Sequence, residues 1–405
     1  MKQDDGWLGA QWLLISSLIV WLTYINPTHY LSPDSTYYLS FAGWLVGLDG
    51  NQYGHVATGW DGTFPLGYPL LIGTLAIATG TSLLVASKLL NIVLTGVFLA
   101  IWRQRIGARR ALWIGSLLVL GSSVRMLTYT WSEWAFLILL LEWSWFMSQP
   151  VEPIRSGRAQ YRYVGILLLL TIGLFLLRYV GGYVVIVYGL MALASYRRTG
   201  WAVARLRIGA DLAYGISMAA FMLGYFFLNS QLSTSPYGGE RFYETDETIW
   251  EKVYLMVLAP MNELLLLRDY IPGEPALLVL VGLLAQVALI GWIGSRLKPQ
   301  RDTLPDWKQT DRQWLRVLLF SAGTYLTLLF ALRFISPFNG PNARLMAPAT
   351  VPLLSVAMVW ISRWNNVSAR RQLGYWWAMF LLCSWLQLLP QVDLWEKLQR
   401  LTSTM

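Results

Sequence analysis

The sequence predicts an all-α polytopic membrane protein with about eleven transmembrane helices. Of its 405 residues, 56% are hydrophobic and only 13% are charged, a balance outside the range of soluble globular proteins. Its 22 tryptophans fit the tendency of this residue to anchor helices at both membrane interfaces. The formal net charge of +9 is carried by basic clusters beside apolar segments. These clusters indicate loop charge, so we expect a lipid bilayer and no nucleic acid as partner.

A membrane span needs about 20 mostly apolar residues, and the chain contains eleven segments of roughly this kind. No small-residue cleavage site follows the first, so we interpret it as a retained span and not as a signal peptide. The predicted spans are 8–25, 81–102, 111–125, 131–148, 163–177, 180–196, 208–228, 276–296, 315–332, 345–362 and 374–390.

Basic residues between the spans predict how the chain is oriented. Clusters occur within 103–110, 155–162, 197–207, 296–316 and 363–371, and all fall on one side of the membrane. By the positive-inside rule that side is the cytoplasm. We therefore expect a single transmembrane domain over 1–405 with its N-terminus inside and its C-terminus outside.

Two long segments lie outside in this topology. The first extracytoplasmic loop, 26–80, contains no Lys or Arg, and an odd number of crossings before the basic residues at 103 assigns 69–80 to a helix at the outer interface. The stretch 163–196 has basic loops at both ends, so it must cross twice and turn outside near Arg178. The second extracytoplasmic loop, 229–275, is expected to contain an amphipathic helix from about 246 to 268.

The first outer loop contains a clear helix start. Ser32 is a suitable N-cap, Pro33 a suitable first helical residue, and Asp34 would face the positive end of the helix dipole. The predicted helix over 33–48 has no charge between Asp34 and Asp49 and is expected at the membrane surface. Asp34 is therefore either a helix-terminal charge or a catalytic carboxylate.

Other polar residues of interest fall on the predicted outer side. Ionisable groups at membrane depth point to function, although lysines and arginines also snorkel toward headgroups. Basic residues that converge beside a carboxylate suit a lipid phosphate, which Arg binds bidentately and Lys as a point charge. The polar residues in question are the carboxylate Glu133 and the basic residues Lys88, Arg125, Arg178, Arg241, Arg333 and Arg344.

Two further readings stay open. Glu142, inside the 131–148 span, fits a proton relay, although a helix–helix contact is the commoner reason for such a residue. His29 or His55 with Asp34 or Asp61 would suit a divalent metal. No tight spacing supports that site, so no cofactor is expected and a metal remains an alternative.

Several short motifs resemble the GT-C superfamily of polyprenyl-phosphate-sugar glycosyltransferases, in particular bacterial relatives of protein O-mannosyltransferases and lipid A aminoarabinose transferases. They are Ser32-Pro33-Asp34-Ser35, Phe64-Pro65-Leu66-Gly67, Ala86-Ser87-Lys88-Leu89, Trp131-Ser132-Glu133, Leu177-Arg178-Tyr179, Gly238-Gly239-Glu240-Arg241 and Asn342-Ala343-Arg344. The resemblance implies a GT-C-like architecture in a bacterial inner membrane, with an extracytoplasmic active site.

The resemblance also implies roles for individual residues. Asp34 is the candidate general base, which would take a proton from the acceptor hydroxyl, and Glu133 is its candidate catalytic partner. The candidate substrate-binding residues, the first three of which would grip the lipid-linked phosphate, are Lys88, Arg178, Arg344, Arg241, Tyr37 and His55.

The function expected from these patterns is transfer of a hexosyl or pentosyl group from a polyprenyl-phosphate donor to an acceptor whose identity the sequence leaves open. The alternative is a transporter or flippase of a lipid-linked intermediate. Transporters often show internal repeats and broken helices, and neither is evident in the sequence. A non-catalytic membrane scaffold is the third reading.

Overall fold

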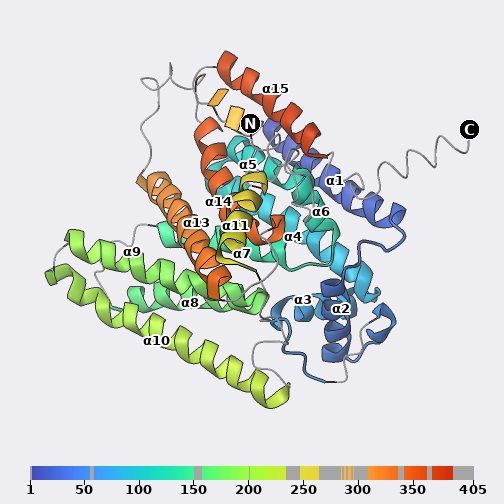
Figure 1. Cartoon of the computed structure of the whole chain (residues 1–405). Helices are drawn as coiled ribbons and strands as arrows, with labels where there is room; N and C mark the ends of the chain where they lie inside the picture. Colours follow the sequence, from blue (N-terminus) through green and yellow to red (C-terminus); the bar gives the residue numbers. More distant parts are fainter. Residues whose placement is uncertain are drawn as a thin grey trace, which may run out of the picture.

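A computed structural model describes most of the chain as a bundle of helices (Figure 1). The described residues are 2–54, 59–149, 157–199, 201–233, 247–263, 309–335, 342–362 and 367–385, with a few positions between 284 and 295. Every regular element in these residues is a helix. The predicted all-α class is therefore confirmed.

The helices follow one another along the chain with short connections over its first half. In order they are α1 (Lys2–Ile25), α2 (Pro33–Val46), η1 (Asn51–Tyr53), α3 (Gly67–Thr79), α4 (Leu83–Ile106), α5 (Ala108–Gly115), η2 (Ser116–Val119), α6 (Gly121–Thr128), α7 (Glu133–Ser148), α8 (Gly157–Leu177), η3 (Tyr179–Gly182), α9 (Tyr183–Thr199), α10 (Trp201–Leu232), α11 (Ile249–Glu263), α13 (Gln309–Ile335), α14 (Ala343–Ser362) and α15 (Val367–Ser384).

Seven helices in the described part of the chain are long and apolar enough to cross a membrane: α1, α4, α8, α9, α10, α13 and α14. They correspond to seven of the predicted spans, which confirms a multi-span protein. The predicted span at 131–148 is α7, a helix of 16 residues. The predicted span at 276–296 lies largely outside the described residues.

The segment predicted as one span at 111–125 is broken. The helical stretches Ala108–Val119 and Gly121–Thr128 meet at an angle of 72°. The Gly121 amide donates to Ser384 Oγ at 2.9 Å, and a Cβ on Gly121 would lie 1.9 Å from the Ser384 carbonyl oxygen. Only glycine permits this approach of α15. The expectation of an unbroken span here is wrong. A lack of broken helices therefore no longer counts against a transporter.

Helix α7 runs through the centre of the bundle and contacts α4, α8, α13 and α14. Its indole and hydroxyl groups are paired with neighbours: Trp143 Nε1 donates to Thr171 of α8 at 3.1 Å, and Trp314 of α13 donates to Ser144 at 3.0 Å. Because buried polar groups need such partners, these bonds fix the rotation of α7. The first residue of α7, Glu133, is thereby held in a defined position.

The predicted helix at 33–48 is confirmed as α2. Ser32 caps it, since its Oγ accepts from the Ser35 amide at 3.2 Å, and Gly47 ends it in the left-handed conformation. Buried residues within α2 include Tyr38 and Leu39, so neighbouring protein covers much of this helix. The predicted interfacial helix at 69–80 is α3, which packs on α2.

Two other sequence expectations can be compared with the structure. Glu142 of α7 forms an ion pair of 2.5 Å with Arg105 of α4, which is the helix–helix contact expected as its commoner role. The predicted helix at 246–268 is α11. Thr248 and Glu251 form a capping box at its start: the Thr248 amide donates to Glu251 Oε2 at 2.7 Å and the Glu251 amide to Thr248 Oγ1 at 3.3 Å.

Candidate functional site

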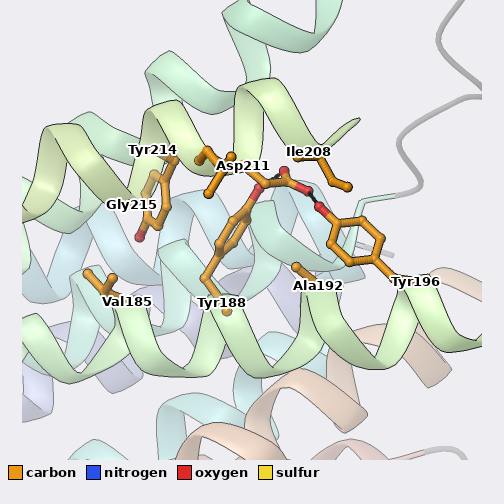
Figure 2. A pocket seen from close by; sticks show the side chains of 10 residues that line it. Val185, Tyr188, Ala192, Tyr196, Ile208, Asp211, Tyr214 and Gly215 are labelled. Carbon is orange, nitrogen blue, oxygen red and sulfur yellow. Dashed lines mark hydrogen bonds between the residues drawn. The ribbon is translucent and has the colours of Figure 1, made fainter. Parts of the chain in front are cut away.

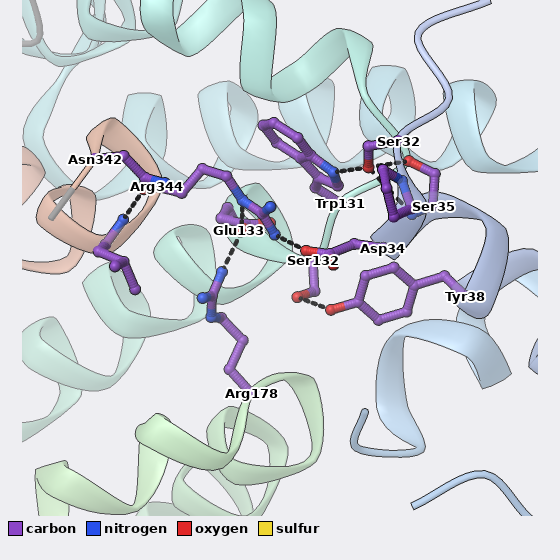
Figure 3. Close-up of polar contacts among 12 residues, drawn as sticks. Ser32, Asp34, Ser35, Tyr38, Trp131, Ser132, Glu133, Arg178, Asn342 and Arg344 are labelled. Carbon is purple, nitrogen blue, oxygen red and sulfur yellow. Dashed lines mark hydrogen bonds and ion pairs between the residues drawn. The ribbon is translucent and has the colours of Figure 1, made fainter. Parts of the chain in front are cut away.

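Four of the candidate residues come together from four separate parts of the chain (Figure 3). Arg344 Nη2 lies 2.7 Å from Asp34 Oδ2, and Arg344 Nε lies 2.5 Å from Glu133 Oε1. Arg178 Nη1 lies 2.5 Å from the same Glu133 oxygen. Two carboxylates and two guanidiniums therefore form one continuous ionic network.

Helix termini position these side chains. Asp34 and Arg344 lie in the first turns of α2 and α14, and Glu133 is the first residue of α7. Asn342 caps α14, because its Oδ1 accepts from the Leu345 amide at 3.1 Å. Three helix N-termini thus meet at the network. The positive ends of their dipoles favour an anion there.

The four side chains differ in their access to solvent. The Glu133 side chain is 2% exposed, whereas those of Asp34, Arg344 and Arg178 are 35%, 22% and 18% exposed. Oε1 of Glu133 receives both guanidiniums, and Oε2 has no hydrogen-bond partner among the described residues. Glu133 therefore acts as a buried counterion, and the other three side chains form the accessible part of the network.

Arg178 occupies the connection between α8 and η3, in an extended conformation. Burial lowers the pKa of its guanidinium, but the Glu133 carboxylate more than compensates, so the pKa lies above its ordinary value. An arginine in this setting is a permanent cation.

Trp131 completes the site and was not among the predicted site residues. The Arg344 guanidinium carbon lies 3.9 Å from the centroid of a Trp131 ring, a cation–π contact. Trp131 Nε1 donates to Ser32 Oγ at 2.7 Å, so one side chain links the starts of α2 and α14. Tyr38 also joins α2 to this region, through a 2.9 Å bond to Ser132 Oγ. Only the tryptophan's place within a quoted motif pointed to it.

Lys88 lies apart from this network. Its ammonium is buried and donates to the Thr128 carbonyl at 2.5 Å and to Thr130 Oγ1 at 3.2 Å. Asn91, one turn further along α4, donates to the Leu127 carbonyl at 2.7 Å. Both side chains thus hold the connection between α6 and α7. The structure places Lys88 where it supports the segment that carries Trp131 and Glu133.

Replacing Lys88 by methionine should therefore lower stability while donor affinity is retained. Loss of the two bonds leaves the Thr128 carbonyl without this donor, at a cost of about 1–3 kcal/mol. The matched variant Asn91→Leu removes uncharged donors to the same connection and should behave alike. Thermal unfolding and polyprenyl-phosphate binding, measured on both purified variants, check this. Weaker binding in Lys88→Met alone would instead assign the ammonium to the phosphate.

The remaining candidates are Tyr37, Arg333, His55 and Arg241. Tyr37 packs against Phe64, with ring centroids 6.0 Å apart, and Arg333 pairs with Glu247, which precedes α11. His55 and Arg241 lie outside the described residues. Within the described part of the chain, no three His, Cys, Asp or Glu side chains converge as metal ligands would.

The chain resembles known proteins in its structure. No protein-family model and no curated protein matches the chain. Among solved structures, it resembles ArnT from Cupriavidus metallidurans in the apo state, with 15% identity over 92% of this chain and a TM-score of 0.51. The same protein bound to undecaprenyl phosphate gives 15% identity and a TM-score of 0.47. The chain covers 62% and 63% of those two chains.

The first of these likenesses concerns the fold. ArnT is a GT-C polyprenyl-phosphate-sugar glycosyltransferase. The structural match to it covers 92% of the present chain. The predicted GT-C-like architecture is therefore confirmed.

Proposed function

We propose that the protein is an integral membrane glycosyltransferase that moves a sugar from a polyprenyl-phosphate donor to an acceptor on the extracytoplasmic face. The observation that carries this proposal is the position of Arg344, which contacts Asp34, Glu133 and Trp131 at once. A GT-C-like fold, with a polyprenyl-phosphate-sugar transferase as structural neighbour, supports the same reading.

The two arginines are the proposed phosphate-binding groups. Guanidinium groups bind phosphate oxygens bidentately. Both arginine side chains are partly accessible, and the buried Glu133 carboxylate forms an ion pair with each. Negative charge grows on the phosphate as the sugar leaves. Fixed cations aimed at that charge stabilise the transition state more than the ground state.

Asp34 is the proposed general base. The acceptor oxygen attacks the anomeric carbon, the bond from that carbon to the phosphate oxygen breaks, and the phosphate keeps the electron pair. Asp34 takes the proton of the acceptor hydroxyl. Its Oδ2 is paired with Arg344 before substrate arrives, and a phosphate that engages Arg344 would weaken this pair. Donor binding would thereby release the carboxylate for proton transfer.

Glu133 is proposed to position the arginines and not to transfer a proton. Removal of a buried ion-pair partner leaves an uncompensated charge, which is strongly unfavourable. Its second oxygen, Oε2, lacks a hydrogen-bond donor among the described residues.

The reaction can be tested by release of the lipid product. Membranes from cells that naturally contain the protein supply the unknown acceptor, and a synthetic polyprenyl-phosphate sugar is added as donor. We expect polyprenyl phosphate to accumulate only where the protein is present, as measured by mass spectrometry. Equal release from membranes that lack the protein would contradict the proposal.

A transporter or flippase of a lipid-linked intermediate is the second candidate, favoured by the 72° break between η2 and α6. Broken helices are common where transporters form their substrate sites. Transport moves the lipid without breaking the sugar–phosphate bond and needs no base. The release assay above separates the two functions, because transport alone frees no polyprenyl phosphate.

The proposed orientation can be tested by cysteine labelling. With Cys383 replaced by serine, a cysteine at the exposed position Gln52 should react with a membrane-impermeant maleimide in intact cells. A cysteine at Lys308, in the basic connector, should react only after permeabilisation, because positively charged loops stay in the cytoplasm. Labelling of position 308 in intact cells would contradict the proposed topology.

A further inference from the structure

A pocket lies between α9 and α10 (Figure 2), and none of the network residues lines it. It has a volume of about 400 Å³ and is lined by α9 from Val185 to Tyr196 and by α10 from Ile208 to Gly215. Small residues create the space: a Cβ added at Gly189 or at Gly215 would meet no atom within 4 Å. The volume falls in the range of small-molecule sites, about 300–1,000 Å³.

The polar groups of this pocket are already paired. Tyr188 and Tyr196 of α9 each donate a phenolic hydroxyl to one oxygen of Asp211 on α10, as Figure 2 shows. Tyr214 bonds to Thr171 of α8 at 2.8 Å. These bonds tie the helices together around the pocket. The surface left for a ligand is mainly carbon, which selects an apolar group.

The surroundings of the pocket are suited to hydrocarbon. Both α9 and α10 are candidate membrane spans, and the apolar side chains Leu190, Leu193, Leu212 and Ile216 on their outer faces are exposed. In a membrane these faces contact lipid tails. A ligand therefore reaches the pocket from the bilayer and not from water.

One charged residue indicates the kind of lipid. Arg197 directly follows the lining residue Tyr196, is exposed, and lies in the last turn of α9, at the start of the basic stretch 197–207. Such a position suits a headgroup phosphate of the cytoplasmic leaflet. Arg178 of the ionic network precedes η3 and lies before the start of α9, whereas the pocket extends along α9 from Val185 to Tyr196, toward its other end. The residues that line the pocket include none of the network residues.

We infer that this pocket binds one acyl chain of a phospholipid from the cytoplasmic leaflet, with the lipid phosphate at Arg197. The acyl chain would fill the space between α9 and α10, beside the hydrogen bonds that Tyr188 and Tyr196 donate to Asp211. The inference does not depend on the proposed sugar transfer, because it involves none of the residues of the ionic network.

Photo-crosslinking tests the site. The full-length protein, in nanodiscs that contain a phosphatidylglycerol with a diazirine near the end of one acyl chain, should be labelled within 185–215. Gly215→Leu fills the pocket and should reduce this labelling about tenfold, equivalent to about 1.4 kcal/mol of binding free energy. Gly209→Leu is the matched control: the same helix, also with no atom within 4 Å of an added Cβ, but outside the lining residues.

Several outcomes would overturn the inference. Parental labelling in Gly215→Leu, or crosslinks that map elsewhere, would show that no chain occupies the pocket. Should Gly215→Leu fold poorly, as judged by gel filtration, Ala192→Leu fills the same space from α9. Equal labelling by a diazirine diacylglycerol, which lacks the phosphate, would remove the assignment to Arg197.

Discussion

Replacing Arg344 with alanine should weaken binding of a polyprenyl-phosphate donor by about ten- to a hundredfold, because each charge-assisted hydrogen bond contributes about 1.5–3 kcal/mol. The guanidinium is the group that contacts both carboxylates and stacks on Trp131. Arg344→Lys keeps the charge but loses the planar fork and the stacking, so it should restore only part of the affinity.

Donor affinity is measured on purified protein in nanodiscs with a fluorescent polyprenyl phosphate. Arg371→Ala is a matched control, since Arg371 also lies over an aromatic ring, that of Tyr375, but on α15 and exposed. Thermal unfolding of each variant separates lost binding from lost folding, because Glu133 loses one of its two cations in Arg344→Ala. Unchanged donor affinity in a folded Arg344→Ala protein would exclude the arginine from the phosphate site.

Replacing Asp34 with asparagine should reduce sugar transfer by about two orders of magnitude or more, in the range of general-base catalysis. Asparagine keeps the size of the side chain but cannot take the acceptor's proton. The helix start should survive, since Ser32 supplies the cap and the lost dipole interaction is only about 0.3–1 kcal/mol. The ion pair with Arg344 is partly exposed, so its loss should cost at most about 1 kcal/mol.

Transfer by Asp34→Asn is measured with the membrane assay, and donor binding on the purified variant. Donor affinity should stay at or above the parental value because Arg344 no longer has to leave a carboxylate. The matched control is Asp49→Asn, which removes an exposed carboxylate between α2 and η1 and should transfer at the parental rate. A folded Asp34→Asn protein with more than about half of the parental rate would rule out the base role of Asp34.

The sequence predicted features that depend on local chemistry. A cap, a proline and an acidic residue in succession specify the start of α2 whatever surrounds it, and the structure has α2 begin there. Long apolar runs likewise identify spans, because a helix satisfies its own backbone in lipid. The alternation of basic and non-basic loops predicted that Asp34, Glu133, Arg178 and Arg344 all lie on the same side of the membrane.

Features that depend on tertiary contacts were not predicted. The hydrogen bonds of Lys88 to the 127–130 connection depend on which face of α4 packs there, and the sequence does not reveal that packing. Trp131 could be read as one more interfacial tryptophan, since its stacking depends on Arg344, more than 200 residues away. At the break before Gly121, the chain contacts Ser384 of α15, a contact that no local pattern encodes.

The central claim, that the arginine–carboxylate network binds a lipid-linked phosphate, is tested most directly by comparing polyprenyl phosphate with uncharged polyprenol as ligands of the parental protein. The account predicts that the phosphate binds at least about tenfold more tightly, a difference of about 1.4 kcal/mol, and that Arg344→Gln abolishes the preference. Equal affinities of the parental protein for phosphate and alcohol would contradict it.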